Sequence, residues 1–526
     1  MRWPTIALSI MATQASAITF LSTPGQAYVD GMRFVQFYFG LPIAMIIISI
    51  TAVPIYHKLK VFTAYEYLEN RFDLKTRGLA ALLFLIQRGL AAGLTIYAPA
   101  IILSTILGWN TQITTFIIGV LVIVYTTLGG TKAVNWTHFH QMFIAMFGMF
   151  AAFFMILYLL PDDISIMDAG FVAGKMGKFN TIDFTFDLNN RYTIWSGIIA
   201  GLFLHLSYFG TDQSQVQRYL TGSSITESRF GFIFNGLAKF PMQFFILLIG
   251  AMLFVFYQFE KPPLFFNSVE INKIQNTAYA SDYQELEVEY EKAHEYKKTR
   301  IRELISAMDD SDQEAIDQAQ NNLNLAEGKT KEIRESAISL MQQNDPEMNP
   351  NDTNYIFLTF VTTFLPVGLV GLVIAAIFAA SMSSTSAELN SLASTTVVDI
   401  YRRMIYKKGN DKHYVIASKV FTAIWGVYAI LLAEYASRLG SLIEAVNILG
   451  SLFYGTILGI FAVAFYFKKI QGTATFYAAI VAETLVFVFH IFEITSFLWY
   501  NVVGCLVVII LAHTINWLTP PQPAVK

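Results

Sequence analysis

A cluster of hydroxyl side chains midway along one apolar segment has the spacing of a cation site. The segment 368–403 begins as a run of small and aliphatic residues. It then carries Ala380, Ser383 and Ser384, followed by Glu388. Positions i, i+3 and i+4 share one face of a helix. A backbone carbonyl and two hydroxyls on that face are hard oxygen ligands, which small hard cations prefer. The pattern predicts a sodium site within the membrane.

The alternative is that these serines are satisfied within their own helix. Hydroxyls in hydrocarbon are costly unless they are hydrogen-bonded. A serine in a membrane helix often donates to the carbonyl one turn earlier. Both interpretations fit the residue pattern taken alone.

The composition places these residues in a membrane protein. Hydrophobic residues make up 55% of the 526 residues, charged residues 14%, and the mean hydropathy is +0.49. Apolar runs of about 18 residues or more recur along the chain, which is typical of transmembrane helices. A net charge of −3 gives no indication of a nucleic-acid partner. The lipid bilayer is therefore the expected environment.

The sequence contains no motif of an enzyme or of a resident cofactor. It has neither a nucleotide-binding loop nor a spacing of metal ligands. Cys505 is the single cysteine and lies in an apolar run, so an intramolecular disulfide framework is excluded. We therefore expect no enzymatic activity and no cofactor besides a coupling ion.

Twelve membrane spans are expected from the apolar runs. They lie at roughly 4–22, 33–56, 77–107, 112–129, 132–160, 191–220, 230–258, 356–401, 414–436, 440–467, 473–493 and 497–517. The eighth run is too long for one span, which predicts a separate helix on the outer surface at its start.

The distribution of basic residues predicts the orientation. Lysine and arginine gather after the second, eighth and tenth spans, for example at Lys58, Arg403 and Lys468. Cytoplasmic loops are enriched in these residues, so these loops and the C-terminus are expected in the cytoplasm. The first span then runs outward. We expect a plasma membrane, and the short tails favour a bacterial inner membrane.

The segment 259–354 interrupts the apolar pattern with charged, helix-prone residues. Stretches such as ELEVEYEKAHEYKKTRIREL predict a solvated helical hairpin on the outer side, between the seventh and eighth spans. One interpretation is a decoration specific to this chain. The other is a lid or a surface that docks a partner.

Five polar stretches stand out within the apolar pattern. In chain order they are SAITFLSTPGQAYVDG, TAYEYLENRF, GGTKAVNWTHFHQ, GTDQSQVQRYLTG and AASMSSTSAELNSLASTTVVDIY. Together they resemble the sodium:solute symporter family, which includes the sodium–glucose, iodide, monocarboxylate, multivitamin, proline and sialic-acid cotransporters. Their order and spacing extend the resemblance from the start of the chain to about residue 470.

The resemblance implies an all-α polytopic membrane protein with a leucine-transporter-like core. That core has two inverted repeats of five helices, within about twelve transmembrane helices in all. The first helix of each repeat is broken at mid-membrane. Gln14 and Ser16 fit a break in the first span, and Gly210 and Asp212 fit a break in the sixth. Irregular backbone is tolerated at that depth where it lines a binding cavity.

The expected organisation has five parts. They are the first repeat at 1–160, spans six and seven at 161–258, the charged insertion at 259–354, spans eight to ten at 355–470, and two further spans with a short tail at 471–526. The family has a helix ahead of the first span, and this chain begins with MRWPT where the connecting loop should end. We therefore expect a truncated or mis-started product whose repeat core is intact.

By resemblance, the core sodium site falls on five residues of the first and eighth spans. The alanines would supply backbone carbonyls and the serines hydroxyls, at positions Ala12, Ala15, Ala380, Ser383 and Ser384.

A second sodium site, present in some members, falls on Ser386 and His138. The family pattern has an aspartate at the position of His138. A neutral imidazole is a poor sodium ligand, so one sodium ion per cycle is expected. His138 could carry a proton instead, or make a hydrogen bond in packing.

By resemblance, the solute pocket falls on seven residues, namely Gln14, Ser16, Thr19, Tyr38, Arg88, Asp212 and Lys239. Ser16 and Thr19 match hydroxyls that hold a carboxylate in the sialic-acid branch. Lys239 matches a sugar-contacting lysine of the glucose branch, which differs from this chain at Thr19 and Tyr38. The sialic-acid branch has its arginine at the position of Ala91, and Arg88, one turn earlier, is the expected substitute. Asp212 and Lys239 could also pair with each other.

The resemblance implies sodium-coupled symport of a small polar solute by alternating access, with Na⁺ and that solute as partners. The mixture of acidic, basic and hydroxyl side chains favours a sugar or a sugar acid. A small monocarboxylate is an alternative solute. A membrane sensor, which binds sodium and solute without accumulating the solute, is an alternative function.

Overall fold

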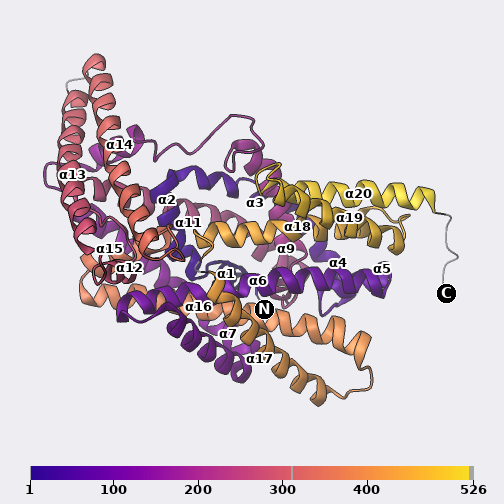
Figure 1. Ribbon diagram of the computed structural model, residues 1–526. Helices are drawn as coiled ribbons and strands as arrows, with labels where there is room; N and C mark the ends of the chain where they lie inside the picture. The colour runs from indigo at the N-terminus through magenta and orange to yellow at the C-terminus, as the bar shows by residue number, and fades with distance from the viewer. Residues whose placement is uncertain (1, 310–311, 437, 520–526) are drawn as a thin grey trace.

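The computed structural model is built of helices and connecting segments in the part that it describes, which is residues 2–309, 312–436 and 438–519 (Figure 1). The side chains of residues 129–141 and 309 lie outside this description. The first half of the chain contains α1 (Trp3–Gln14), α2 (Ala17–Asp30), η1 (Gly31–Tyr38), α3 (Leu41–Ile50), α4 (Ala52–Leu59), α5 (Ala64–Arg71), α6 (Leu74–Leu107), α7 (Thr111–Tyr158), α8 (Ile166–Lys175), η2 (Ser196–Ala200), α9 (Gly201–Gly210), α10 (Gln213–Tyr219) and α11 (Ile225–Phe259).

The second half begins with the charged insertion and ends with a pair of helices packed against α18. Its elements are α12 (Ser268–Ile274), α13 (Ala280–Asp309), α14 (Gln313–Asn344), η3 (Thr353–Tyr355), α15 (Ile356–Phe364), α16 (Val367–Thr395), η4 (Thr396–Ile405), α17 (Asp411–Ala436), α18 (Leu442–Tyr466), α19 (Gly472–Ile491) and α20 (Trp499–Leu518).

Nine helical runs of the described residues are long and apolar enough to cross a membrane. Two further apolar helices, Met142–Tyr158 and Ser196–Gly210, are shorter. The number is below the twelve expected spans partly because Ala17–Leu59 forms one run, which joins the end of the first expected span to the second. In addition, α7 contains both the fourth and the fifth expected spans. The chain is thus a multi-pass membrane protein.

Polar residues at the predicted loops start the long helices. Asp73, Asn110 and Ser224 precede α6, α7 and α11, and the side chain of each accepts a backbone N–H of the first turn. Such caps satisfy donors that have no partner inside the helix. The local sequence therefore sets where these helices begin.

Both predicted breaks are present. Ala15 and Ser16 interrupt the first span between α1 and α2, and Thr211 and Asp212 interrupt the sixth between α9 and α10. Asp212 caps α10, because its side chain accepts the Ser214 N–H over 2.8 Å. The long eighth run is also divided as expected. Pro366 separates α15 from α16.

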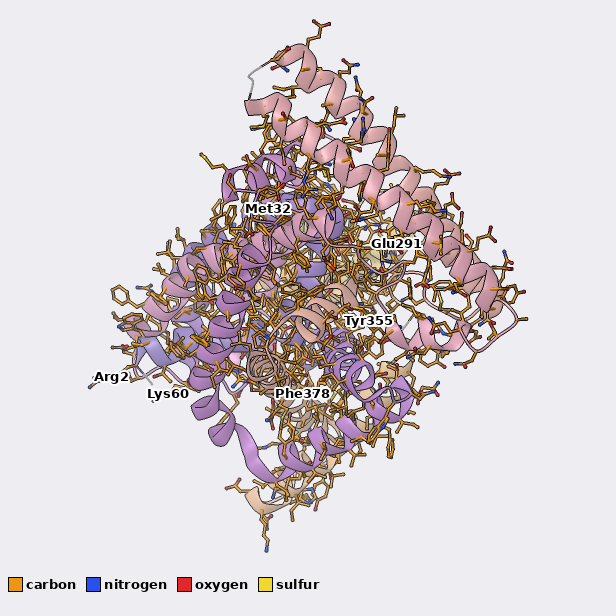
Figure 2. The ribbon with its side chains drawn as sticks, turned by 90° about the vertical axis from the view of Figure 1, so that its left-hand side faces the viewer. Arg2, Met32, Lys60, Glu291, Tyr355 and Phe378 are labelled. Carbon is orange, nitrogen blue, oxygen red and sulfur yellow. The ribbon has the colours of Figure 1, made fainter. Side chains whose placement is uncertain are left out.

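The charged insertion is an antiparallel hairpin of α13 and α14, which projects from the helical body at one end of the molecule (Figures 1 and 2). Glu291 marks its exposed face in Figure 2. His294 Nε2 donates to the carbonyl of Tyr257 in the last turns of α11, over 3.0 Å. Arg302 pairs with Asp163 in the loop before α8. The hairpin is therefore fixed to the transmembrane helices at more than one point.

The base of the hairpin lies against α2. Arg334 of α14 donates twice to Asp352, over 2.6 and 2.7 Å, and Asp352 also accepts the Phe266 N–H over 2.7 Å. The ring of Phe266 lies edge-on to Tyr28 of α2, at 5.8 Å between centroids. At Gly25 of α2, an added Cβ would lie 2.0 Å from the Thr353 carbonyl oxygen. Only a glycine allows this close approach.

Candidate functional site

The break in the first span exposes backbone carbonyls. The last four carbonyls of a helix have no partner within it. In α1, the carbonyl of Met11 accepts the Ala15 N–H and that of Gln14 accepts the Thr19 hydroxyl. Within the described part of the chain, the carbonyls of Ala12 and Thr13 accept no hydrogen bond from the segment after the break. Carbonyls freed in this way are available to a cation.

The serines belong to α16, a helix that packs against α1. Ser383 is buried, and its hydroxyl has no hydrogen-bond partner among the described residues. Ser384 donates to the carbonyls of Ala380 and Ser381, over 3.1 Å each. The bonding of serines within their own helix therefore applies to Ser384 and not to Ser383. Because a hydroxyl oxygen that donates its proton still has lone pairs, both serines could coordinate a cation.

The predicted second ion site is only partly described. Ser386 is buried, and its hydroxyl has no hydrogen-bond partner among the described residues. His138 belongs to α7, but its side chain lies outside the description.

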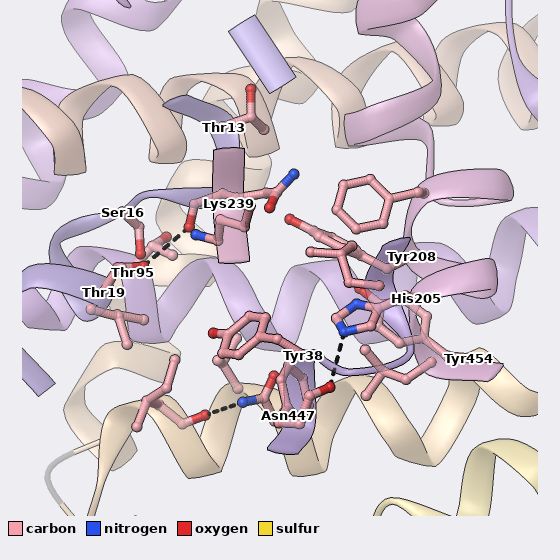
Figure 3. A pocket seen from close by; sticks show the side chains of 18 of the residues that line it. Thr13, Ser16, Thr19, Tyr38, Thr95, His205, Tyr208, Lys239, Asn447 and Tyr454 are labelled. Carbon is pink, nitrogen blue, oxygen red and sulfur yellow. Dashed lines mark hydrogen bonds between the residues drawn. The ribbon is translucent and has the colours of Figure 1, made fainter. Parts of the chain in front are cut away.

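A cavity of about 120 Å³ lies beside the first break and the end of α9 (Figure 3). One part of its wall is polar, with hydroxyls, an amide and charged groups. The other part is apolar and includes Ile18, Leu204, Phe209 and Val446. Such a division suits a ligand with one polar and one less polar side.

The structure brings six of the seven predicted solute residues to this cavity. They are Gln14, Ser16, Thr19, Tyr38, Arg88 and Lys239. Asp212 is not part of the lining, although it contacts two residues that are, Arg88 and Tyr454.

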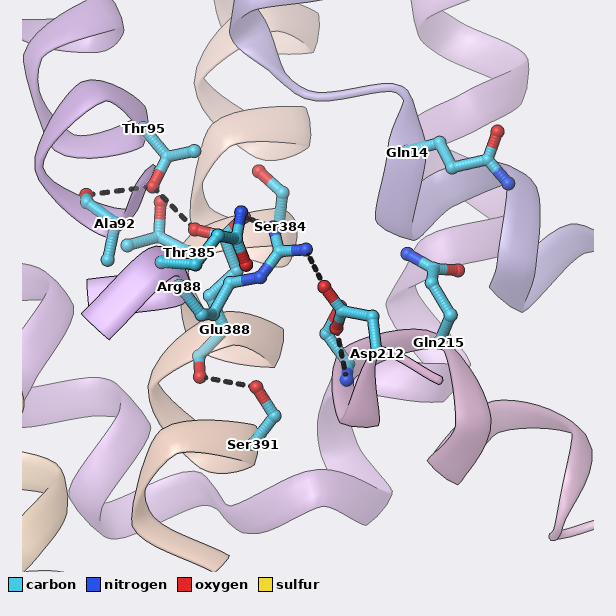
Figure 4. A network of polar contacts seen from close by, with 12 residues as sticks. Gln14, Arg88, Ala92, Thr95, Asp212, Gln215, Ser384, Thr385, Glu388 and Ser391 are labelled. Atoms are coloured by element: carbon cyan, nitrogen blue, oxygen red, sulfur yellow. Dashed lines mark hydrogen bonds and ion pairs between the residues drawn. The ribbon is translucent and has the colours of Figure 1, made fainter. Parts of the chain in front are cut away.

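Arg88 is the centre of a buried polar network (Figure 4). Its guanidinium pairs with Glu388 Oε1 over 3.0 Å and with Asp212 Oδ2, and donates to the Tyr454 hydroxyl over 2.8 Å. Tyr454 in turn donates to Asp212 Oδ2 over 3.0 Å. The suggested pairing of Asp212 with Lys239 is therefore wrong. Arg88 lies nearer, and its planar fork binds carboxylates of both α16 and the second break.

Lys239 of α11 enters the cavity as a buried cation. Its side chain is 3% exposed, and it lines the cavity together with Ser16 and Thr19. Among the residues that the structure describes, no carboxylate forms an ion pair with it, since Asp212 and Glu388 are both bound to Arg88. A buried ammonium group without a partner is energetically costly.

Several lining residues were absent from the predicted site. His205, Tyr208, Asn447 and Tyr454 line the cavity from α9 and α18, and the sequence marks none of them by motif. Glu388 could have been found, because an ionisable residue inside a membrane span is a functional candidate by default.

Ion pairs connect the helices at the end of the molecule that holds α4 and α5 (Figure 1). Arg77 pairs with Asp399 over 2.6 Å and with Glu69 over 2.6 Å, and Arg403 also pairs with Glu69. Burial opposes ionisation of Glu69, but hydrogen bonds from Arg403 and Arg77 outweigh it and hold the pKa of its carboxyl below the usual value. This cluster links α5, α6 and η4.

Hydrogen bonds connect α2 to the start of α18 on the hairpin side. Ser441 donates to Gln26 over 2.6 Å, and the Ile443 N–H donates to the Ser22 hydroxyl over 3.1 Å. Asn354, at the base of the hairpin, donates to the Gly440 carbonyl over 2.9 Å. The cavity thus lies between two sets of polar contacts.

The model of the sodium:solute symporter family matches residues 1–280 and 346–482. The unmatched residues between these parts include nearly all of α13 and α14. The hairpin is therefore an addition to the matched family core.

Curated relatives include the sodium/sialic acid symporter SiaT of Proteus mirabilis. It is 26% identical over 511 residues, which is 96% of this chain and 85% of the relative. The sodium/sialic acid symporter NanT of Aliivibrio fischeri is 25% identical, over 98% of this chain and 84% of the relative. The human sodium/iodide cotransporter is 29% identical over 252 residues. This chain spans only 39% of that relative's length.

A solved structure of a sodium-coupled sialic acid symporter, in a substrate-bound outward-open state, has the same fold. It is 24% identical, with a TM-score of 0.73, over 99% of this chain and 91% of that one. The broken helices, the cavity beside them and the match over both parts of the core lead to one conclusion. This chain belongs to the sodium:solute symporter family.

Proposed function

We propose that this chain is a secondary active transporter, which carries a small hydroxylated organic acid together with sodium across a bacterial inner membrane. The observation that carries this proposal is Lys239, a buried ammonium group that faces the cavity while both nearby carboxylates are bound to Arg88. A carboxylate on the solute would pair with this cation. The relatives named as sialic acid symporters support a sugar acid.

The hydroxyl and amide groups around the cavity support a solute that carries several hydroxyl groups. Ser16, Thr19, Thr95 and Asn447 line it, and hydroxyl and amide groups form hydrogen bonds with a polyhydroxylated solute. The apolar wall formed by Leu204 and Phe209 favours a second candidate, a small monocarboxylate with an alkyl end.

Sodium is proposed to bind where α1 and α16 meet. The carbonyls of Ala12, Ala15 and Ala380 and the hydroxyls of Ser383 and Ser384 would supply five oxygens of the kind that a hard cation prefers. The Ser383 hydroxyl supports this site, since it has no hydrogen-bond partner in the described part of the chain and a buried hydroxyl without a hydrogen bond is costly. One ion per cycle is proposed.

Transport follows from the two sets of polar contacts around the cavity. Sodium arrives from outside and joins α1 to α16, and the solute binds beside the breaks. The contacts of α2 with α18 and the cluster around Asp399 then open alternately. A membrane potential contributes about 2.3 kcal/mol per charge per 100 mV, which is enough to drive accumulation with one ion.

The first experiment measures the melting temperature of the purified protein in sodium or potassium, with a panel of solutes. The panel contains sialic acid, other sugar acids, neutral sugars and small monocarboxylates. We expect sodium to raise the melting temperature, and one acid to raise it further only with sodium present. Equal effects of sodium and potassium would refute sodium coupling, and stabilisation by neutral sugars alone would refute the acid.

Lys239→Gln tests the carboxylate partner directly. We expect about a 100-fold loss of affinity for the acid that binds the parent protein, since a buried charge pair lacks one partner. Without solute the variant should melt at the same or a higher temperature, because it lacks a buried cation that has no ion pair among the described residues. Lys261→Gln is the matched control, since Lys261 is exposed and pairs with Glu291.

Uptake into proteoliposomes separates a transporter from a sensor. A transporter accumulates the acid against its gradient when sodium is high outside. A sensor binds the acid with the same sodium dependence but shows no accumulation, and that result would refute transport.

A further inference from the structure

The position of Arg88 between two carboxylates points to a role beyond solute contact. Glu388 belongs to α16, the helix that carries Ser383 and Ser384, and Asp212 lies at the break between α9 and α10. Arg88 holds both, through Nη1 to Glu388 and Nη2 to Asp212 (Figure 4). One side chain of α6 therefore connects the sodium helix to the second broken helix.

The two carboxylates are held on their other sides as well. Asp212 Oδ1 accepts the N–H and the hydroxyl of Ser214, over 2.8 and 2.7 Å. Glu388 Oε2 accepts the Thr95 hydroxyl over 2.9 Å. Both carboxylates are thus fixed in direction, and Arg88 itself is only 4% exposed. A network with this many partners favours one arrangement of its members.

The charges of this network are not balanced. Two carboxylates face one guanidinium, which leaves one negative charge in excess among Arg88, Asp212 and Glu388. Glu388 lies four residues after Ser384, which is about 6 Å along a helix at 1.5 Å per residue. A sodium ion on Ser383 and Ser384 would neutralise that excess at short range. Lys239 would then be left as the positive charge for an anionic solute.

We propose that Arg88 is a positioning residue, which couples sodium on α16 to the shape of the solute cavity through Glu388 and Asp212. Sodium draws α16 towards α1 and changes the attraction between Glu388 and Arg88. Arg88 lines the cavity and holds the second break through Asp212, so both parts of the solute site respond. This coupling rests on the proposed sodium site.

The test uses a reporter cysteine and needs no solute. Cys505→Ala removes the single native cysteine, and Asn447→Cys places a thiol on the cavity wall. Asn447 is suitable because, among the described residues, its amide donates only to the Ile443 carbonyl in its own helix. The labelling rate with a small thiol reagent is compared in sodium and in potassium. Melting temperatures in the same buffers report sodium binding separately.

In the reporter protein, sodium should change the labelling rate by about fivefold or more. About fivefold is the lower limit of the typical effect of one binding site on another. Glu388→Gln and Asp212→Asn should each reduce that response to less than about twofold. Sodium should still raise the melting temperatures of both variants. Glu388→Gln should need a higher sodium concentration, because this variant lacks the excess negative charge that attracts the ion. Asp212→Asn keeps a residue that can cap α10.

A double variant distinguishes coupling from general damage. If both carboxylates act through Arg88, the double variant should lose no more of the sodium response than either single variant. Glu483→Gln, which changes a glutamate of α19 outside the cavity lining, should keep the full response.

A full sodium response in both single variants would overturn the coupling role and leave the proposed transport intact. Additive losses in the double variant would overturn it too, because the carboxylates would then act independently. A parent protein whose melting temperature and labelling rate both ignore sodium would refute the proposed function itself.

Discussion

Arg77 donates from Nε to Asp399 Oδ1 over 2.8 Å, and so joins the start of α6 to the end of the helical segment that carries the serines. Thr63 donates to the same oxygen over 2.7 Å. Arg77 and Asp399 are 3% and 0% exposed. Removing one partner of such a buried ion pair strongly destabilises a protein, because the other charge is left buried and unpaired.

Asp399→Asn should therefore loosen this end of the molecule. We expect a loss of about 3 kcal/mol in the free energy of unfolding, because Glu69 is then the one charged partner of Arg77 among the residues that the structure describes. The cavity should also become more accessible from the side of α5, measured with the Asn447→Cys reporter in vesicles of known orientation. Asp411→Asn, at the start of α17, is the control. An unchanged labelling rate would show that this cluster is not a gate.

Ser383→Ala should remove the stabilisation by sodium without lowering the stability of the sodium-free protein. The hydroxyl of Ser383 has no hydrogen-bond partner among the described residues, and a buried group left unsatisfied costs about 1–3 kcal/mol. The variant should therefore melt at the same or a higher temperature in potassium, and lose the increase in sodium. Ser391→Ala is the matched control, because Ser391 is buried on the same helix and donates to the Glu388 carbonyl over 2.7 Å. A Ser383→Ala protein with the parent's sodium response would place the ion elsewhere.

Asp352→Ala should detach the base of the hairpin. Asp352 is the partner of Arg334 and accepts the Phe266 N–H. The change leaves the Arg334 guanidinium without its carboxylate, with the Leu264 carbonyl as a remaining acceptor, and leaves the Phe266 N–H without its acceptor. We expect a loss of about 3 kcal/mol, seen as a lower melting temperature and faster proteolysis between α13 and α14. Arg302→Ala, which breaks the exposed pair with Asp163, should cost less than about 1 kcal/mol. Equal effects of the two changes would contradict this role of Asp352.

His294 should make the docking of the hairpin dependent on pH. Burial lowers the pKa of His294, against the opposing effect of its hydrogen bond to the Tyr257 carbonyl, and Lys297 lowers it further. An unfolded histidine titrates near about 6.5. The stabilisation is therefore complete above that pH, and it is lost as the pH falls from there through the lower pKa of the folded state.

The variant that checks this is His294→Gln. Glutamine can donate to the same carbonyl but does not titrate. The melting temperature should therefore vary less between about pH 7 and about pH 5, the range in which a histidine changes its charge. His513→Gln, on the exposed end of α20, should leave the pH profile unchanged. A profile that persists in His294→Gln would assign the effect to other groups.

The sequence alone determined a helical membrane protein, and its resemblance to the family implied the two breaks. Long apolar runs must be helices in a membrane, because backbone groups have no other partners there. Gly210 and Asp212 fit the break that the resemblance implies in the sixth span. The charged composition of 259–354 likewise indicated a hairpin outside the apolar body, which α13 and α14 form.

Only the tertiary structure decided which charged groups meet. Arg88, Asp212 and Glu388 are more than 120 residues apart in the chain, and no spacing rule connects such positions. Packing brought Arg88 to both carboxylates and left Lys239 in the cavity without an ion pair among the described residues. The same holds for Asp352, whose contacts with Arg334 and Phe266 depend on how the hairpin folds back. Residue type thus determined what each group can do, and long-range packing determined which partner it has.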